Sequence, residues 1–160
     1  MSELHPECGA ANDEENTTFV EGYLDYLLSH TANGFERQYQ VVLDKHKVSR
    51  HEWRILCCIS EFPDANMEEM SILTLIPEKI LADNLNEIEK KGWVRSNRDK
   101  DGNSRYLIEQ TGLDLLVPLL VAAKSHESDA LSKFSAQEVR QFKSMLKEHC
   151  CPVNFHTKAI

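Results

Sequence analysis

The chain has 160 residues, of which 41% are hydrophobic and 28% are charged. This length and composition predict one compact globular domain and exclude a disordered or collagen-like protein. No apolar run reaches the ~18 residues that a membrane-spanning helix needs. Residues 1–16 lack the basic and apolar regions of a signal peptide. We therefore expect a cytoplasmic protein whose thiols are reduced.

The net charge of −8 is unevenly distributed along the chain. Residues 1–16 contain five acidic residues and no lysine or arginine, which predicts a flexible acidic tail. Residues 90–105 contain six basic and two acidic residues and form the only concentrated positive region. The overall charge argues against a nucleic-acid binder, but a local positive segment can still contact phosphates.

The five cysteines are Cys8, Cys57, Cys58, Cys150 and Cys151. Because no C-x-x-C motif occurs, their spacing predicts neither a zinc knuckle nor a thioredoxin-type redox pair. Adjacent cysteines on one helix point in different directions, so Cys57 and Cys58 are predicted to be small core residues. A redox sensor that uses either of them is an alternative.

The first helix is predicted to extend from residue 17 to residue 44. Thr18-x-x-Glu21 forms a capping box, in which each side chain satisfies a free backbone N–H of the other residue. Apolar residues then recur at helical spacing. The pattern weakens at Gly34, where we expect a bend.

Three shorter helices are predicted next. Capping boxes at Ser49-x-x-Glu52 and Asn66-x-x-Glu69 begin the first two. Pro77 suits the first position of the third helix, which Gly92 ends. The apolar stripe predicted to be buried on this third helix comprises Leu81, Leu85 and Ile88.

The apolar period then changes from helical to alternating. Trp93–Arg98 and Ser104–Ile108 have the pattern of two short strands, and Asp101-Gly102 between them is typical of a hairpin turn. The sequence therefore predicts a β-hairpin with basic strands after the three helices.

Two further helices are predicted after the hairpin. Thr111 is expected to cap the first, and Pro118 should kink it. Ser135-x-x-Glu138 caps the second, whose inward residues are predicted to be Val139, Phe142, Met145 and Leu146. Together with helix 17–44, these two helices carry more apolar surface than one small domain needs, which predicts a dimer interface.

A short helix, a turn, a second helix and a basic hairpin form the winged helix-turn-helix arrangement, whose second helix enters the major groove. Over Phe19–Cys150 the sequence resembles the MarR family of bacterial transcriptional regulators. Four segments in the family's order and spacing carry this resemblance: Val48–Leu56, Ile88–Val94, Asp101–Arg105 and Phe134–Glu138.

The resemblance implies a mainly α fold with a small β-hairpin wing. Residues 17–160 then form a single MarR-type domain, with dimerisation helices at 17–44 and 111–150 and a winged helix-turn-helix at 49–110. The implied function is that of a homodimeric repressor on a pseudo-palindromic operator in double-stranded DNA. A small phenolic or hydroxycinnamic acid would release it, as in a regulator of aromatic-acid breakdown.

Three departures from the family pattern bear on these expectations. Recognition helices of the family usually carry Ser or Thr followed by Arg, where this chain has Ala82 and Asp83. Family wings often have an arginine directly after Asp-Gly, where this chain has Asn103. The first helix lacks the cysteine that peroxide-sensing members carry. His126 lacks a partner one turn away, so no metal site is predicted.

The residues predicted to contact DNA lie on the recognition helix and the wing. Those on the helix are Glu78, Lys79, Asn84 and Asn86. Those on the wing are Arg95, Arg98, Asn103, Ser104 and Arg105. Lys90 and Lys91 either contact phosphate or form a solvated helix end that complements the helix dipole.

The resemblance implies an effector pocket between the first helix, the start of the second and the fifth, near the dimer interface. An aromatic carboxylate needs a basic or hydroxyl group and flat apolar walls. The candidate residues are Ser29, His30, Arg37, Arg50, Trp53 and His126. Apart from this effector, no cofactor is predicted.

The sequence contains no G-x-S-x-G, H-E-x-x-H or P-loop motif, so we do not expect an enzyme. The alternative function is that of a winged-helix protein–protein adaptor without DNA binding. The acidic charge balance, Ala82 and Asp83 favour this alternative, whereas the basic segment 90–105 argues against it.

Overall fold

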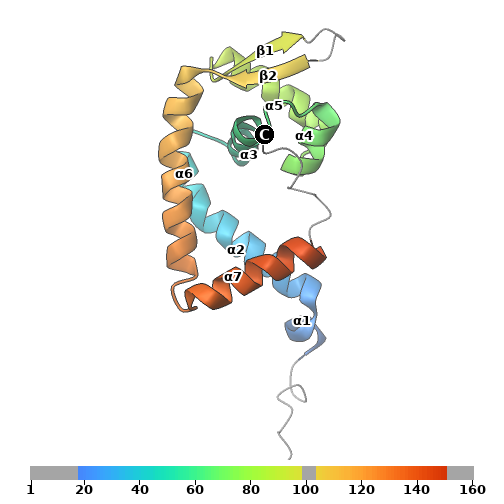
Figure 1. Cartoon of the computed structure of the whole chain (residues 1–160), viewed down its shortest axis with the longest axis vertical. Coiled ribbons are helices and arrows are strands. Elements are labelled where there is room, and N and C mark those ends of the chain that lie inside the picture. The colour runs from blue at the N-terminus through green and yellow to red at the C-terminus, as the bar shows by residue number, and fades with distance from the viewer. Residues whose placement is uncertain (1–17, 99–103, 151–160) are drawn as a thin grey trace, which may run out of the picture. The chain divides into compact units, whose positions relative to one another are not determined.

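The computed structural model describes residues 18–98 and 104–150 (Figure 1). The chain divides between Gln38 and Tyr39 into two compact units. In the part of the chain that is described, no helix has the length and apolar character needed to cross a membrane.

The first unit contains α1 (Phe19–Gly22) and the beginning of α2 (Leu24–Lys45). The predicted capping box forms, because the Thr18 backbone N–H donates to Glu21 Oε2 at 2.9 Å. The single helix predicted here is interrupted at Tyr23, whose backbone is extended, with φ −81° and ψ 120°. The chain therefore begins with one helical turn followed by a long helix.

Helix α2 continues through Gly34 without interruption, so the glycine at which a bend is expected does not end the helix. One glycine lowers helix stability by about 1 kcal/mol, which a helix of 22 residues tolerates. The interruption occurs at Tyr23 instead, where its ring stacks on that of Phe19 with centroids 4.8 Å apart.

Large apolar side chains of the first unit are exposed rather than buried. Each of the following is at least 40% exposed: Phe19, Val20, Tyr23, Leu24, Tyr26 and Leu27. We call this set the N-terminal apolar surface.

Three helices of the second unit begin where the sequence predicts them: α3 (Arg50–Glu61), α4 (Met67–Thr74) and α5 (Glu78–Lys90). Both predicted capping boxes form, one at Ser49 and one at Asn66. Pro77 is the N-cap of α5 rather than its first helical residue.

A Schellman motif ends α5 at the predicted glycine. Gly92 has a φ of 73°, in the left-handed region that favours glycine. Its N–H donates to Glu89 O at 2.9 Å, and the Trp93 N–H donates to Ile88 O at 3.0 Å. These two bonds satisfy carbonyls at the end of α5 and set the direction in which the chain leaves the helix.

The hairpin consists of β1 (Val94–Arg98) and β2 (Ser104–Ile108), as predicted. The strands are antiparallel, with Val94 opposite Ile108 and Arg98 opposite Ser104. The predicted turn at Asp101-Gly102 and the candidate DNA contact Asn103 lie outside the described residues.

Two long segments complete the fold: α6 (Gln110–Ala130) and α7 (Ala136–Met145), the latter followed by a π-helical turn at Leu146–Cys150. The prediction that Thr111 caps α6 is wrong, because the N-cap is Glu109. Thr111 lies in the first turn, where its hydroxyl donates to the carbonyl of Gly92.

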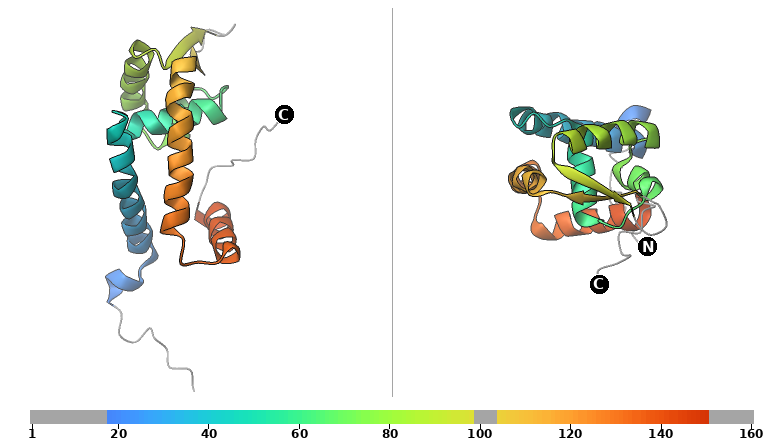
Figure 2. Two further views of the ribbon diagram at one scale, coloured as in Figure 1. Left: turned by 90° about the vertical axis from the view of Figure 1, so that its left-hand side faces the viewer. Right: turned by 90° about the horizontal axis from the view of Figure 1, so that it is seen from above.

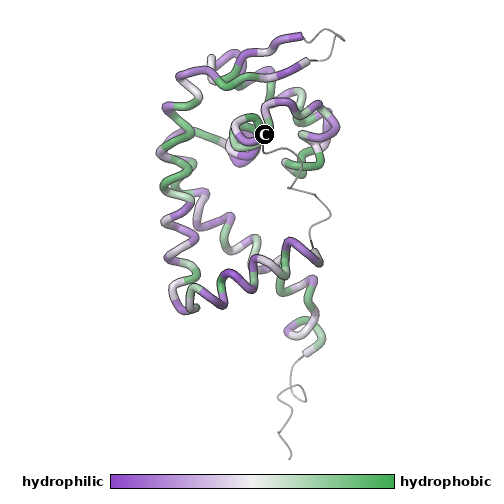
Figure 3. The backbone as a smooth tube through the Cα atoms, viewed as in Figure 1, coloured by the Kyte–Doolittle hydropathy of each residue, from purple (hydrophilic) through white to green (hydrophobic). Residues whose placement is uncertain are grey.

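Helix α6 also continues through Pro118, so the expected kink does not interrupt it. Figure 3 shows that its first half is hydrophobic and its second half polar. Leu116 and Leu119 are at most 1% exposed, whereas Pro118 lies on the exposed side of the helix.

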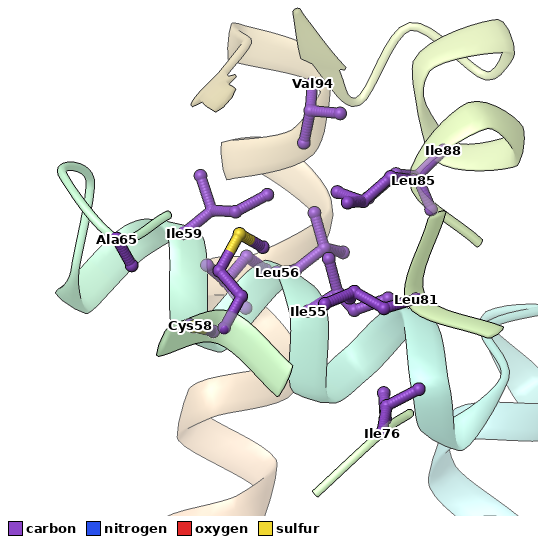
Figure 4. Close-up of a cluster of buried hydrophobic side chains, with 12 residues drawn as sticks. Ile55, Leu56, Cys58, Ile59, Ala65, Ile76, Leu81, Leu85, Ile88 and Val94 are labelled. Carbon is purple, nitrogen blue, oxygen red and sulfur yellow. The ribbon is translucent and has the colours of Figure 1, made fainter. Parts of the chain in front are cut away.

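The main core surrounds α3, which contacts α4, α5, α6 and β2. The view from above in Figure 2 shows α4 and α6 on opposite sides of α3. The predicted apolar stripe of α5 is buried against Ile55 and Leu56 of α3 (Figure 4). Its members are Leu81, Leu85 and Ile88, each at most 1% exposed. This packing fixes α5, which presents its opposite face to solvent.

The inward positions predicted for α7 are wrong for the single chain. Phe142 is 42% and Met145 is 56% exposed, and Val139 and Leu146 are only partly buried. The capping box at Ser135 forms as predicted, so the helix itself begins where expected. Among the described residues of the second unit, no side chain of α7 is buried.

Candidate nucleic-acid interface

The solvent-facing side of α5 is defined by the buried stripe on its other side. At 100° per residue, positions half a turn from Leu81, Leu85 and Ile88 point away from the core. The exposed residues at these positions are Lys79, Asp83, Asn86, Glu87 and Lys90. We call this set the outward face of α5, and Lys79 and Asn86 are the two predicted DNA contacts that it contains.

The two other predicted contacts on this helix lie elsewhere. Glu78 is exposed in the first turn, where a negative charge complements the helix dipole. Asn84 is partly buried, and its Nδ2 donates to Ile80 O at 2.8 Å. The Asn84 amide is thus bound to its own helix and does not point with Lys79 and Asn86.

Lys90 and Lys91 have different environments although they are adjacent. Lys90 is exposed and pairs with Glu87 at 2.8 Å, and this hydrogen bond lowers the pKa of the Glu87 carboxyl. Lys91 Nζ bonds to Glu52 Oε1 at 2.5 Å and lies 4.5 Å from the centre of the Trp93 ring. Since Glu52 is 6% exposed, Lys91 neutralises a buried carboxylate and joins α3 to the end of α5.

The register of the hairpin places its arginines on two faces. Residues directly opposite each other in an antiparallel pair share a face. Arg95 and Arg105 lie on one face, since they stand opposite Leu107 and Asn97. Arg98 lies on the other face with Ser104 and Val94. The sequence predicts that a short wing presents these arginines together, and the register instead divides them.

The root of the wing is fixed to α5 and α6. The Glu89 Oε1 atom accepts from Ser96 N at 2.7 Å and from Ser96 Oγ at 2.6 Å, which lowers the pKa of the Glu89 carboxyl. Arg95 Nε pairs with Glu109 Oε1 at 2.6 Å. These contacts hold the hairpin in place beside α5, with Arg98 and Ser104 at the ends of the strands that border the turn.

The six predicted effector residues fall in both units. Ser29, His30 and Arg37 are exposed on the first-unit part of α2. The second unit contains Arg50, Trp53 and His126, all partly buried.

Tyr39 brings two of these effector candidates together. Its ring centroid lies 5.4 Å from that of Trp53 and 5.8 Å from that of His126. The Tyr39 hydroxyl donates to Leu119 O at 2.7 Å, and burial raises the pKa of Tyr39 to about 12. The hydroxyl therefore stays a donor that holds the end of α2 on α6.

A hollow of about 350 Å³ lies between α3 and α4. Trp53 is the predicted effector residue among those that line it. The others are Arg54, Cys57, Cys58, Glu61, Phe62, Leu73, Thr74 and Leu75. Sequence reasoning missed them, although the spacing of Trp53, Cys57 and Glu61 already places three residues on one face of α3.

The two thiols of the hollow are held in their neutral form. Burial is the main cause that raises the pKa of Cys57 to about 12, and the nearby Glu61 carboxylate adds to it. Burial alone raises the pKa of Cys58 to about 11. Because the thiolate is the reactive form, this environment disfavours a redox function. In the described part of the chain, no three His, Cys, Asp or Glu residues are arranged to hold a metal ion.

No family model matches the chain, and no curated protein matches it by sequence. Solved structures do match its fold. A MarR family transcriptional regulator from Silicibacter pomeroyi is 18% identical, with a TM-score of 0.76 over 87% of this chain and 95% of that chain.

Two further matches were solved with small molecules. CouR from Rhodococcus jostii, bound to p-coumaroyl-CoA, is 14% identical, with a TM-score of 0.74 over 86% of this chain and 98% of CouR. NadR in complex with 4-hydroxyphenylacetate is 15% identical, with a TM-score of 0.73 over 82% of this chain and 95% of NadR. The chain thus has the mainly α winged helix-turn-helix fold of MarR-family structures, as its sequence resemblance predicts.

Proposed function

We propose that this protein is a MarR-type transcriptional repressor that binds double-stranded DNA as a homodimer. The observation that carries the proposal is the exposed outward face of α5 beside a hairpin with Arg98 and Arg105, on the fold of MarR-family regulators. Helix α5 enters the major groove and reads bases, while the wing contacts the phosphate backbone.

The exposed apolar helices support the homodimer. The N-terminal apolar surface and the exposed Phe142 and Met145 of α7 are apolar faces that residues 18–98 and 104–150 leave exposed. A second copy covers such faces symmetrically, because the same surface then contributes from both chains. Two-fold symmetry in turn requires a pseudo-palindromic operator with half-sites about 10 bp apart.

The first experiment measures DNA binding by fluorescence anisotropy, with duplexes from upstream of the protein's own gene. The logarithm of the association constant should fall linearly with the logarithm of salt concentration, because binding releases counterions from the phosphates. Arg98→Ala and Arg105→Ala should each weaken binding, whereas Lys124→Ala on the polar half of α6 serves as the matched control. The absence of binding at low salt would favour the protein–protein adaptor.

We further propose that a small phenolic or hydroxycinnamic acid lowers the affinity for DNA by binding at the hollow between α3 and α4. Its walls include the flat apolar rings of Trp53 and Phe62, and Arg54 supplies a positive charge for a carboxylate. NadR was solved with 4-hydroxyphenylacetate, which is a phenolic acid, and CouR with p-coumaroyl-CoA, which is the CoA thioester of a hydroxycinnamic acid.

Trp53 connects the proposed ligand site to the elements that are proposed to bind DNA. Trp53, Trp93 and Leu115 pack against both hydrophobic clusters of the second unit, one around α3 and α5 and one around Tyr39 and Leu119. A ligand that moves Trp53 therefore disturbs both clusters. A coupling free energy of about 1–3 kcal/mol changes DNA affinity about 5–150-fold, provided that the ligand binds the two states unequally.

The effector proposal is tested by adding phenolic and cinnamic acids to the preformed protein–DNA complex. Release by one acid supports it. Quenching of tryptophan fluorescence by the same acid in a Trp93→Phe variant, whose remaining tryptophan is Trp53, places the ligand near Trp53. Arg54→Gln should lower ligand affinity and leave DNA binding intact, whereas His30→Ala, at a residue that does not line the hollow, should change neither. DNA binding that no acid of the panel relieves would contradict the effector class but not the DNA-binding function.

A further inference from the structure

The outward face of α5 includes an exposed carboxylate, that of Asp83, which the proposed function does not yet use. Asp83 lies opposite the buried stripe, at the middle of the helix. The neighbouring acids of α5 have partners, since Glu87 pairs with Lys90 and Glu89 accepts from Ser96. Within the described residues, no hydrogen bond or ion pair engages Asp83.

A carboxylate in this place is repelled by the phosphates of DNA. It lowers affinity unless a base donates a hydrogen bond to it. The major groove presents two such donors, the N4 amino group of cytosine and the N6 amino group of adenine. Adenine also presents the acceptor N7 beside its amino group, which repels a carboxylate, so cytosine is the base that a lone carboxylate prefers.

We infer that Asp83 is a specificity-determining residue that accepts a hydrogen bond from the N4 amino group of a cytosine in each half-site of the operator. This inference rests on the proposed function, because it requires α5 to lie in the major groove. Lys79 lies one turn before Asp83 on the same face and is a donor, so it suits a guanine or phosphate neighbour of that cytosine. Wing arginines supply affinity, whereas Asp83 reduces binding to sequences that lack the cytosine.

The test begins with selection of binding sites from randomised duplexes by the full-length protein. Anisotropy titrations then compare the selected duplex with one in which the C·G pair of each half-site is replaced by T·A, which removes the N4 amino group. The wild-type protein should bind the replaced duplex at least about fivefold more weakly. Asp83→Asn should bind both duplexes within twofold of each other, because its amide can accept from cytosine N4 or donate to thymine O4. It should also bind random DNA more tightly, since a repulsive charge is gone.

Glu87→Gln is the matched control, because it removes the same charge one turn later on the same face. It should raise affinity for both duplexes and keep the wild-type preference for cytosine. Asp83 is exposed, so the thermal unfolding midpoint of both variants should equal that of the wild type. This measurement separates a change in recognition from a change in folding.

Three results would overturn the inference, and they differ from those that overturn the proposed function. Selection without a fixed cytosine, cytosine preference retained by Asp83→Asn, or equal loss of preference in Glu87→Gln would each remove the role assigned to Asp83. In all three cases salt-dependent DNA binding would persist. A wild-type protein that fails to bind any duplex at low salt would instead overturn the proposed function.

Discussion

Helices α5 and α7 are both amphipathic and of similar length, but only α5 buries its apolar face. Leu81, Leu85 and Ile88 of α5 are at most 1% exposed, whereas Phe142 and Met145 of α7 are 42% and 56% exposed. Both helices satisfy the same pattern of apolar residues three and four positions apart. Periodicity therefore identifies the apolar face of a helix. Whether another element covers that face depends on the rest of the assembly.

The largest effect is expected when a charge is placed on the exposed apolar face of α2 or α7. Leu27→Glu and Met145→Glu should each convert the expected dimer to a monomer at micromolar concentration. In a two-fold dimer each chain contributes one copy of the substituted residue. Two unpaired charges are therefore buried, and the desolvation penalty is paid for both. Light scattering measures the mass, and circular dichroism shows whether the helices persist.

Ile72→Glu is the matched control, since Ile72 of α4 is 52% exposed but lies outside these helices. It should leave the mass unchanged. A wild-type protein that is monomeric at the same concentration would contradict the prediction and leave the apolar face of α7 without its proposed partner.

The second prediction compares burial within the winged segment. Leu85→Ala should lower the free energy of unfolding by about 2–5 kcal/mol, because it removes a buried side chain and leaves a cavity. Ile72→Ala, on an exposed site, should change it by less than about 0.5 kcal/mol. Urea unfolding at a fixed protein concentration measures both. Similar values for the two variants would show that the core around α3 is not as well packed as its burial indicates.

The third prediction concerns the two adjacent lysines at the end of α5. Lys91→Met should lower the free energy of unfolding by about 1–3 kcal/mol, because Glu52 loses the partner of its buried carboxylate. Lys90→Met removes an exposed pair and should leave the unfolding midpoint within experimental error. Equal effects of the two substitutions would mean that the contact between Lys91 and Glu52 does not anchor α5 on α3.

The fourth prediction concerns the reactivity of the two thiols that line the hollow. In a variant with Cys8, Cys150 and Cys151 replaced by serine, alkylation at pH 8 should be much slower than for the same variant in urea. The raised pKa values, about 12 for Cys57 and about 11 for Cys58, keep the thiolate fraction low in the folded protein. Rapid alkylation of Cys57 and Cys58 in the folded protein at pH 8 would instead favour the redox sensor.

The same pKa values set the direction of a pH effect on stability. A thiol whose pKa is raised in the folded protein stabilises the fold fully below its ordinary pKa of 9.0. This contribution is lost as the pH rises toward 11–12. Substitution of both thiols by alanine should therefore reduce the loss of stability above pH 9 and leave the pH dependence near pH 7 unchanged.

Local signals predicted most of the winged segment and the start of α7. Capping boxes at Ser49, Asn66 and Ser135, the glycine that ends α5 and both strands are found at their predicted places. Each depends on residues within a few positions of one another, so the sequence contains the whole interaction. Where a local signal was only a weak preference, as for Thr111 as the cap of α6, the prediction was wrong.

The candidate site could be predicted only in part, because side chains on one element have partners on others. Lys79 and Asn86 lie on the outward face of α5, but Asn84 is bound to its own helix. The arginines of the wing are divided by a register that depends on strand pairing. The hollow between α3 and α4 combines residues from two helices that touch only after folding.

By itself, the sequence determined where helices and strands of the winged segment begin and which of their faces are apolar, because caps and periodicity are local. Only the tertiary structure decided which polar groups are already engaged. Lys91 bonds to Glu52, 39 positions away, and the Thr111 hydroxyl bonds to Gly92 instead of capping its helix. Such partners are distant in sequence, and only the packing of α3, α5 and α6 brings them within hydrogen-bond distance.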